Sequence, residues 1–187
     1  MRFSKLLMVG TVSLFTLPWL IGLSTGPAQA QEVSWERIIG IQQAFDLVGM
    51  GTGQVTGGAP WETTAGAAQV NLKTRKVRFA VQGLVLAVGS AGNGAFTGLD
   101  IGTPAGVTQV KATLVCGVNG SAGKGNSVLV DTPAVALSAQ GDAQFNGKVG
   151  PLPAVCSSAP DIAFLLRIVV PAAFADRWIA AGAVRTP

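Results

Sequence analysis

The chain has 187 residues, of which 49% are hydrophobic and only 12% are charged. This composition excludes a disordered chain, because disordered chains are poor in apolar residues and rich in net charge. The sequence contains no His and no Tyr and only two Cys. Catalysis by His, and zinc or haem ligation by His, are therefore excluded, and no cofactor or metal site is predicted.

The first 30 residues have the pattern of an export signal. Arg2 and Lys5 precede an apolar run from Leu6 to Leu23, and the tripeptide Ala28-Gln29-Ala30 provides small residues at a cleavage site. We expect cleavage after Ala30, a mature protein of residues 31–187 and a secreted or periplasmic location. The later apolar stretch 162–184 contains three charged residues and a proline, so no membrane span is predicted in a soluble mature chain.

Short apolar runs separated by Gly, Pro, Asn and Asp follow the signal, which is typical of strands joined by turns. The first strands are expected at 36–41, continuing toward 47–48, and at 54–56 after a Gly-rich crossing. Residues 57–60 read as a turn, so Trp61 is placed in a loop with an exposed ring. Such a ring could stack on a ligand or a partner, although Trp side chains are more often buried.

The strongest periodic signal predicts a hairpin over residues 68–81. Alternation places Val70, Leu72, Val77, Phe79 and Val81 on a buried face and leaves residues 78 and 82 in water, with a turn at 73–76. The basic run 73–78 is then a solvated hairpin tip. The mature chain has 11 basic and 9 acidic residues, so nucleic-acid binding is not predicted.

Further strands are expected at 84–88, 107–116, 127–130, 134–137, 143–149 and 163–170. A proline at 171 and the spacing of Phe174 and Trp178 favour a short helical turn, followed by a closing strand over 178–184. Eight to ten short strands predict one all-β domain over 31–187, an antiparallel β-sandwich or, alternatively, a β-barrel.

Cys116 and Cys156 form an even pair in a chain predicted to be exported, so we expect a disulfide between them. Closing a loop of this length should stabilise the fold by about 4 kcal/mol. No C-x-x-C spacing is present, and a structural role is therefore favoured over a redox role.

The nine acidic residues are Glu32, Glu36, Asp46, Glu62, Asp100, Asp131, Asp142, Asp161 and Asp176. A glycosidase needs two carboxylates on either side of a sugar, and folding could bring any two together. Several of these acids stand beside Gly or Pro, where a role in a turn is expected instead.

Several segments together resemble a family of small exported bacterial proteins of unassigned function. These segments are 57–61, 70–79, 83–86, 107–116, 130–133 and 177–180. The hairpin and the following Gly-Leu are also similar to chordin-type extracellular β domains, although the His often found there is missing. The resemblance implies an exported β protein and no catalytic residues.

The sequence therefore predicts a non-catalytic binding or structural module outside the cytoplasm, with an unidentified extracellular or envelope partner and an undetermined oligomeric state. The alternative is a small hydrolase of carbohydrate or another polymer that uses two carboxylates. These two hypotheses differ in whether a carboxylate pair meets in a cleft.

Overall fold

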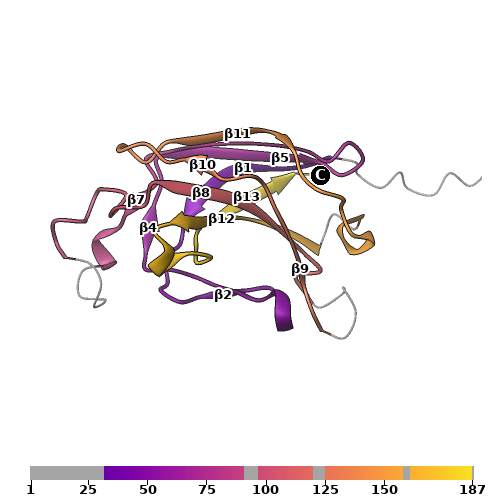
Figure 1. The fold of residues 1–187 in the computed structure, drawn as a ribbon, viewed down its shortest axis with the longest axis horizontal. Coiled ribbons are helices and arrows are strands. Elements are labelled where there is room, and N and C mark those ends of the chain that lie inside the picture. Colours follow the sequence, from indigo (N-terminus) through magenta and orange to yellow (C-terminus); the bar gives the residue numbers. More distant parts are fainter. Residues whose placement is uncertain (1–31, 91–96, 120–124, 158–160, 187) are drawn as a thin grey trace, which may run out of the picture.

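The computed structural model describes residues 32–90, 97–119, 125–157 and 161–186. Its elements are strands and short 3-10 turns, which confirms the all-β prediction (Figure 1). The predicted signal, residues 1–30, lies outside the described residues. The strands are β1 (Glu32–Gly40), β2 (Leu47–Val48), β3 (Val55–Thr56), β4 (Trp61–Glu62), β5 (Ala65–Asn71), β6 (Lys76–Gln82), β7 (Val85–Leu86), β8 (Gln109–Cys116), β9 (Val128–Asp131), β10 (Val135–Ala136), β11 (Ala143–Lys148), β12 (Ile162–Val170) and β13 (Trp178–Thr186).

The main sheet is antiparallel and has the strand order β10-β8-β12-β13-β1-β5-β6-β11, with β9 also paired to β8. It curls into a half-barrel, because strands far apart in this order meet across its inner face. The ring of Phe164 in β12 lies 5.5 Å from that of Trp35 in β1 and 5.8 Å from that of Phe79 in β6, measured between centroids. Two small sheets, β2-β3 and β4-β7, accompany the half-barrel.

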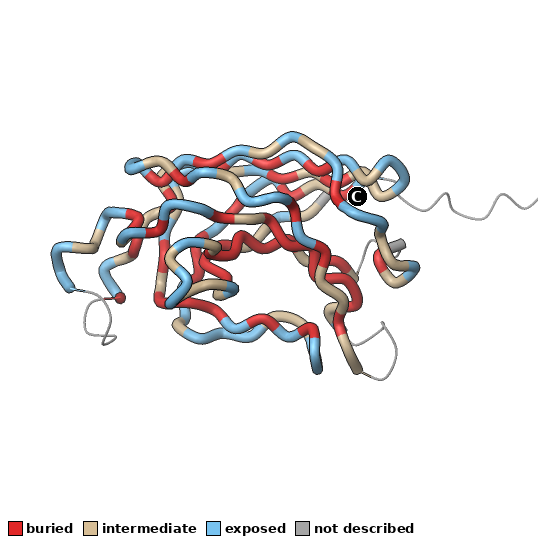
Figure 2. Tube along the Cα trace, viewed as in Figure 1, coloured by how far each residue is buried: buried red, intermediate tan, exposed pale blue. Residues whose placement is uncertain are grey.

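The strands β1, β5, β6 and β11 bury one face only. In β6 the burial alternates strictly, with Val77, Phe79 and Val81 buried and the residues between them exposed. This alternation is the signature of a sheet with one face on the core and one in water, and Figure 2 shows it as alternating colours along these strands. The predicted hairpin is confirmed here, except that Leu72 belongs to the turn 72–75 and is half-buried.

The other half of the sheet is buried on both faces. Residues 41–60 leave β1 and cross the outside of β8, β12 and β13, where the backbone N–H of Gly58 donates to the carbonyl of Trp178. The indole N–H of Trp178 in turn donates to the carbonyl of Asp46 at 3.0 Å. Covering both faces explains why β12 is buried from Phe164 to Ile168 without alternation.

Close approach of two backbones fixes a glycine in this covering segment. A Cβ atom built on Gly53, in the 3-10 turn Gly51–Gly53, would lie 1.9 Å from the carbonyl oxygen of Ser127. Only glycine fits at this point. The Gly-rich segment seen in the sequence is therefore part of the segment 41–60, which covers the outside of β8, β12 and β13.

The chain ends as predicted in a short turn and a closing strand. A 3-10 turn, Ala172–Phe174, precedes β13. Strand β13 pairs with β12 on one side and β1 on the other. It joins the two halves of the sheet, so the closing strand is central.

Candidate functional site

The structure joins Cys116 and Cys156, as predicted from the sequence. Their Cα atoms lie 5.0 Å apart, and both residues are fully buried. Cys116 ends β8, and Cys156 lies in the 3-10 turn Ala154–Ser157. The bridge ties the loop after β11 to the doubly covered half of the sheet, which is a structural role.

Trp61 does not have the predicted exposed ring. It lies in strand β4 instead of a turn, pairs with Leu86 of β7, and is only 1% exposed. Its backbone N–H donates to the carbonyl of Ile41. A buried ring cannot stack on a ligand at the surface, so the prediction of an exposed ligand contact is wrong. Trp35 and Trp178 are buried as well.

Four charged side chains form a network over the end of β8 and β12. The Lys111 ammonium lies 2.8 Å from Asp131 and 2.9 Å from Asp176. The Arg167 guanidinium, whose side chain is 8% exposed, lies 2.9 Å from Asp176 and 3.4 Å from Asp131. Thr113 donates its hydroxyl to Asp131 at 2.7 Å. Two cations and two carboxylates therefore neutralise one another.

The network favours the charged forms of the Asp176 carboxylate and the Lys111 ammonium. The hydrogen bond from Lys111, aided by the nearby Arg167, lowers the pKa of Asp176 below its ordinary value. Desolvation is the largest single influence on Lys111 and opposes its charge. The hydrogen bonds from Lys111 to Asp131 and Asp176 outweigh it and raise the pKa of Lys111.

This electrostatic setting argues against a role of Asp176 as a catalytic acid, although one ammonium group bridges its carboxylate and that of Asp131. A catalytic acid of a glycosidase needs a raised pKa so that it is protonated at neutral pH. The pKa of Asp176 is moved the other way. The network therefore links β8 and β12 to Asp131 at the end of β9 and to the turn that carries Asp176.

Four of the other acids serve local structure. Asp46, Asp100, Asp142 and Asp161 each accept a hydrogen bond from a backbone amide or a side-chain amide or hydroxyl. For example, Asp142 accepts from the backbone N–H of Gly83 at 3.0 Å. That bond anchors a glycine with a φ of +60° between β6 and β7. The carboxylates of Asp142 and Asp161 therefore join segments that are distant in the sequence.

Glu36 and Glu62 line one groove together. The groove lies where β1 separates from β5, and Thr63 donates its hydroxyl to the carbonyl of Ile38 at its side. Both carboxylates are exposed. This groove places two acids, neither of which is engaged in an ion pair with a described residue, next to the same open space.

A second groove crosses the outer face of β1, β5, β6 and β11. It has a volume of about 700 Å³, and all its lining residues come from these four strands. Ala67 and Ala80 are directly paired across β5 and β6 and are both exposed, so their small side chains form its floor. Longer polar side chains surround them, namely Ser34, Glu36, Gln69, Arg78, Gln144 and Asn146. We call this the outer groove.

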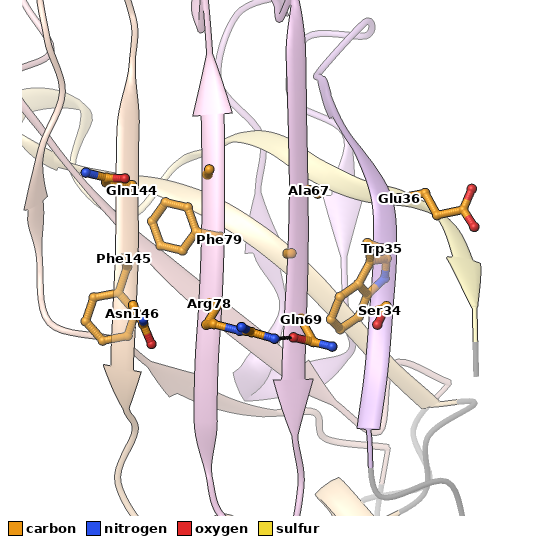
Figure 3. Close-up of a pocket in the computed structure, with 12 residues that line it drawn as sticks. Ser34, Trp35, Glu36, Ala67, Gln69, Arg78, Phe79, Gln144, Phe145 and Asn146 are labelled. Atoms are coloured by element: carbon orange, nitrogen blue, oxygen red, sulfur yellow. Dashed lines mark hydrogen bonds between the residues drawn. The ribbon is translucent and has the colours of Figure 1, made fainter.

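Cross-strand hydrogen bonds order one side of the outer groove. Arg78 donates to the side-chain oxygen of Gln69, and Gln69 donates to Glu32. Figure 3 shows the Arg78 side chain extending from β6 to Gln69 on the neighbouring strand β5. These contacts fix polar groups that face solvent. The sequence predicted that residue 78 is exposed, but it contained no signal for the groove, which depends on the pairing of Ala67 with Ala80.

Neither a membrane-spanning helix nor a metal centre is found in the described part of the chain. No helix there is long and apolar enough to cross a bilayer. No group of three or more Cys, Asp or Glu side chains in those same residues is arranged to hold a metal ion.

The chain was compared with protein-family models, with curated proteins and with solved structures, and none of the three comparisons found a match. The resemblance to small exported proteins and to chordin-type domains therefore remains a prediction from the sequence.

Proposed function

We propose that this protein is an exported, non-catalytic binding module that recognises an extracellular or envelope partner through the outer groove. The observation that carries this proposal is the floor of Ala67 and Ala80 surrounded by polar side chains, two of which are fixed by hydrogen bonds. Concave sites with a few ordered polar groups are favoured for binding, because little side-chain freedom is lost when the ligand arrives.

Export is supported by the signal pattern of residues 1–30 and by the buried disulfide between Cys116 and Cys156. Disulfides persist mainly in oxidising compartments. The direct measurement is N-terminal mass analysis of the exported protein, which should begin at Gln31. Recovery of Met1 on the exported protein would contradict signal cleavage.

The binding proposal is tested by filling the outer groove. Ala80→Gln places a neutral side chain over the floor, and it should fold because alanine is not favoured in strands. Ala65→Gln is the matched control, since Ala65 is an exposed residue of the same strand set that does not line the outer groove. In pull-downs against cell-envelope and polysaccharide fractions, Ala80→Gln should lose capture while Ala65→Gln retains it. Equal capture by both variants would refute the proposal.

A polymer hydrolase is the second candidate, and the shared groove of Glu36 and Glu62 favours it. The single variant Glu62→Gln separates the two functions, because Glu62 lines this groove and not the outer groove. If the wild-type protein releases reducing ends from a polysaccharide and this variant does not, the hydrolase is correct. If neither releases them while both are captured by the fraction, the binding module stands.

A further inference from the structure

Like charges meet on the outer face where β6 pairs with β11. Lys148 is directly opposite Lys76 in the register of the two strands, and both side chains are exposed. Arg78 is on the same face of β6, two residues along, and is opposite Asn146. Like charges directly across an antiparallel pair repel each other, so this arrangement lowers the stability of the sheet.

The hairpin turn adds two more cations to this end of the outer groove. Lys73 and Arg75 lie in the turn 72–75, and the carbonyl of Arg75 accepts a hydrogen bond from the backbone N–H of Val149, just after Lys148. We define the basic end as Lys73, Arg75, Lys76, Arg78 and Lys148. Five of the eleven basic residues that follow residue 30 are therefore gathered beside one groove.

Two cations of the covered half are engaged, whereas those of the basic end are not neutralised. Lys111 and Arg167 are each within ion-pair distance of two carboxylates. In the described part of the chain, no carboxylate lies within ion-pair distance of the five cations of the basic end. The nearest acid by register is Glu32, opposite Asn71, and its carboxylate accepts a hydrogen bond from Gln69.

From this contrast we infer that the outer groove and the basic end bind an acidic polysaccharide, with carboxylates at the cations and hydroxyls at the amides. The inference rests on the proposed function and names its ligand class. Gln69, Gln144 and Asn146 line the groove, and amide side chains both donate to and accept from hydroxyls. A repeating acid placed along the sheet would relieve the repulsion between Lys76 and Lys148.

Two other polyanions fit this surface less well. A lipid surface is bound by cations together with apolar side chains that enter it, but none of the large exposed hydrophobic residues of the described chain lies in the groove or the basic end. Single-stranded nucleic acid is bound by cations together with exposed aromatic rings. The aromatic side chains along the groove point to the inner face of the sheet and pack in the core; they are Trp35, Phe79 and Phe145.

The test measures binding of the mature protein to polygalacturonate, a carboxylated polysaccharide, and to dextran, a neutral one. We expect binding to polygalacturonate that weakens as salt rises, because exposed charges are screened, and weaker binding to dextran. Lys148→Gln should reduce affinity for polygalacturonate by about five-fold, as expected for one cation at an anionic surface. Arg37→Gln is the matched control, since Arg37 is exposed, lines the other groove and carries the same charge.

A melting curve of each variant separates a binding role from a structural one. Lys148→Gln should melt at or above the wild-type temperature, because it removes a like-charge pair, and the loss of affinity then reports the ligand contact alone. Equal losses of affinity in Lys148→Gln and Arg37→Gln would overturn the inference. Binding of anionic phospholipid vesicles without binding of polygalacturonate would overturn it as well.

The outcome for Ala80→Gln keeps this inference distinct from the proposed function. If Ala80→Gln loses capture by envelope fractions but the wild-type protein ignores polygalacturonate, the groove binds something else and only the acidic ligand is refuted. If Ala80→Gln and Lys148→Gln both weaken polygalacturonate binding while Ala65→Gln and Arg37→Gln do not, both proposals are supported.

Discussion

The two halves of the half-barrel differ in what their second face does. Strands β8, β12 and β13 are covered on the outside by residues 41–60, and their charged side chains form a neutral network around Lys111 and Arg167. Strands β1, β5, β6 and β11 leave their outer face in water, with unneutralised cations at one end. Both halves therefore stabilise the fold with their inner face, but only the half made of β1, β5, β6 and β11 presents its outer face as a surface.

The largest expected loss of stability comes from the aromatic residues on the inner face of the sheet, where the two halves pack against each other. Phe79 is 4% exposed and packs against Phe164 and Phe145. Phe79→Ala should leave a cavity and lower the free energy of unfolding by about 3–5 kcal/mol. Arg78→Ala, one residue away on the outer face, should change it by less than about 0.5 kcal/mol. Equal shifts in urea midpoint would show that β6 does not bury one face only.

Replacing one arginine in each half gives a direct comparison of how much their charged side chains contribute to stability. Arg167→Met should lower the free energy of unfolding by about 1–2 kcal/mol, because it removes the charged hydrogen bonds of a buried guanidinium while the two carboxylates, 36% and 63% exposed, keep contact with water and with Lys111. Arg78→Met on the outer face should leave stability nearly unchanged. If chemical denaturation shows Arg167→Met to be as stable as the wild type, the charged network does not fasten the covered half.

Lowering the pH is expected to have a smaller effect on stability, through Asp176. The folded pKa of Asp176 is below its unfolded value, so its contribution is complete above about pH 4 and is lost as pH falls through the folded pKa. The side chain is 63% exposed, and the contribution should therefore stay below about 1 kcal/mol. Melting temperature between pH 6 and pH 2 should fall less in Asp176→Asn than in the wild type. Parallel curves would contradict this role.

The smallest effect has the opposite sign. Lys148→Gln should raise the free energy of unfolding by up to about 0.5 kcal/mol, because Lys76 then faces an uncharged side chain. Lys76→Gln should give a similar gain, and the double variant should gain little more. A loss of stability in the single variants would mean that these lysines are neutralised within the protein.

The one-face-buried strands could be predicted from the sequence because alternation is a local property. The alternation of Val77, Phe79 and Val81 is enough to locate the hairpin and its core face. The disulfide could be predicted from a count of two Cys. Residues 163–170 could also be predicted as a strand. Because they are apolar without alternation, their sequence does not indicate which segment covers the second face.

What escaped prediction depends on contacts between distant segments. Trp61 follows Gly-Gly-Ala-Pro, which favours a turn, yet its pairing with Leu86 places it in a strand with a buried ring. The outer groove depends on the register that brings Ala67 opposite Ala80, and the basic end depends on the pairing of Lys148 with Lys76. The pairing of β11 with β6 joins segments far apart in the sequence, so no local pattern reveals it. The register of Ala67 and Ala80 is fixed by the hairpin turn 72–75, which the sequence predicted one residue later, at 73–76.

We conclude that the outer face of β1, β5, β6 and β11 serves recognition, whereas the outer face of β8, β12 and β13 serves stability. This division of roles can be measured by amide chemical-shift mapping of the ¹⁵N-labelled mature protein during titration with polygalacturonate oligosaccharides. We expect shifts at Gln69, Arg78, Gln144 and Lys148 and unchanged signals at Lys111 and Arg167. Shifts centred on the Lys111 network, or an unperturbed outer face with saturating oligosaccharide, would contradict it.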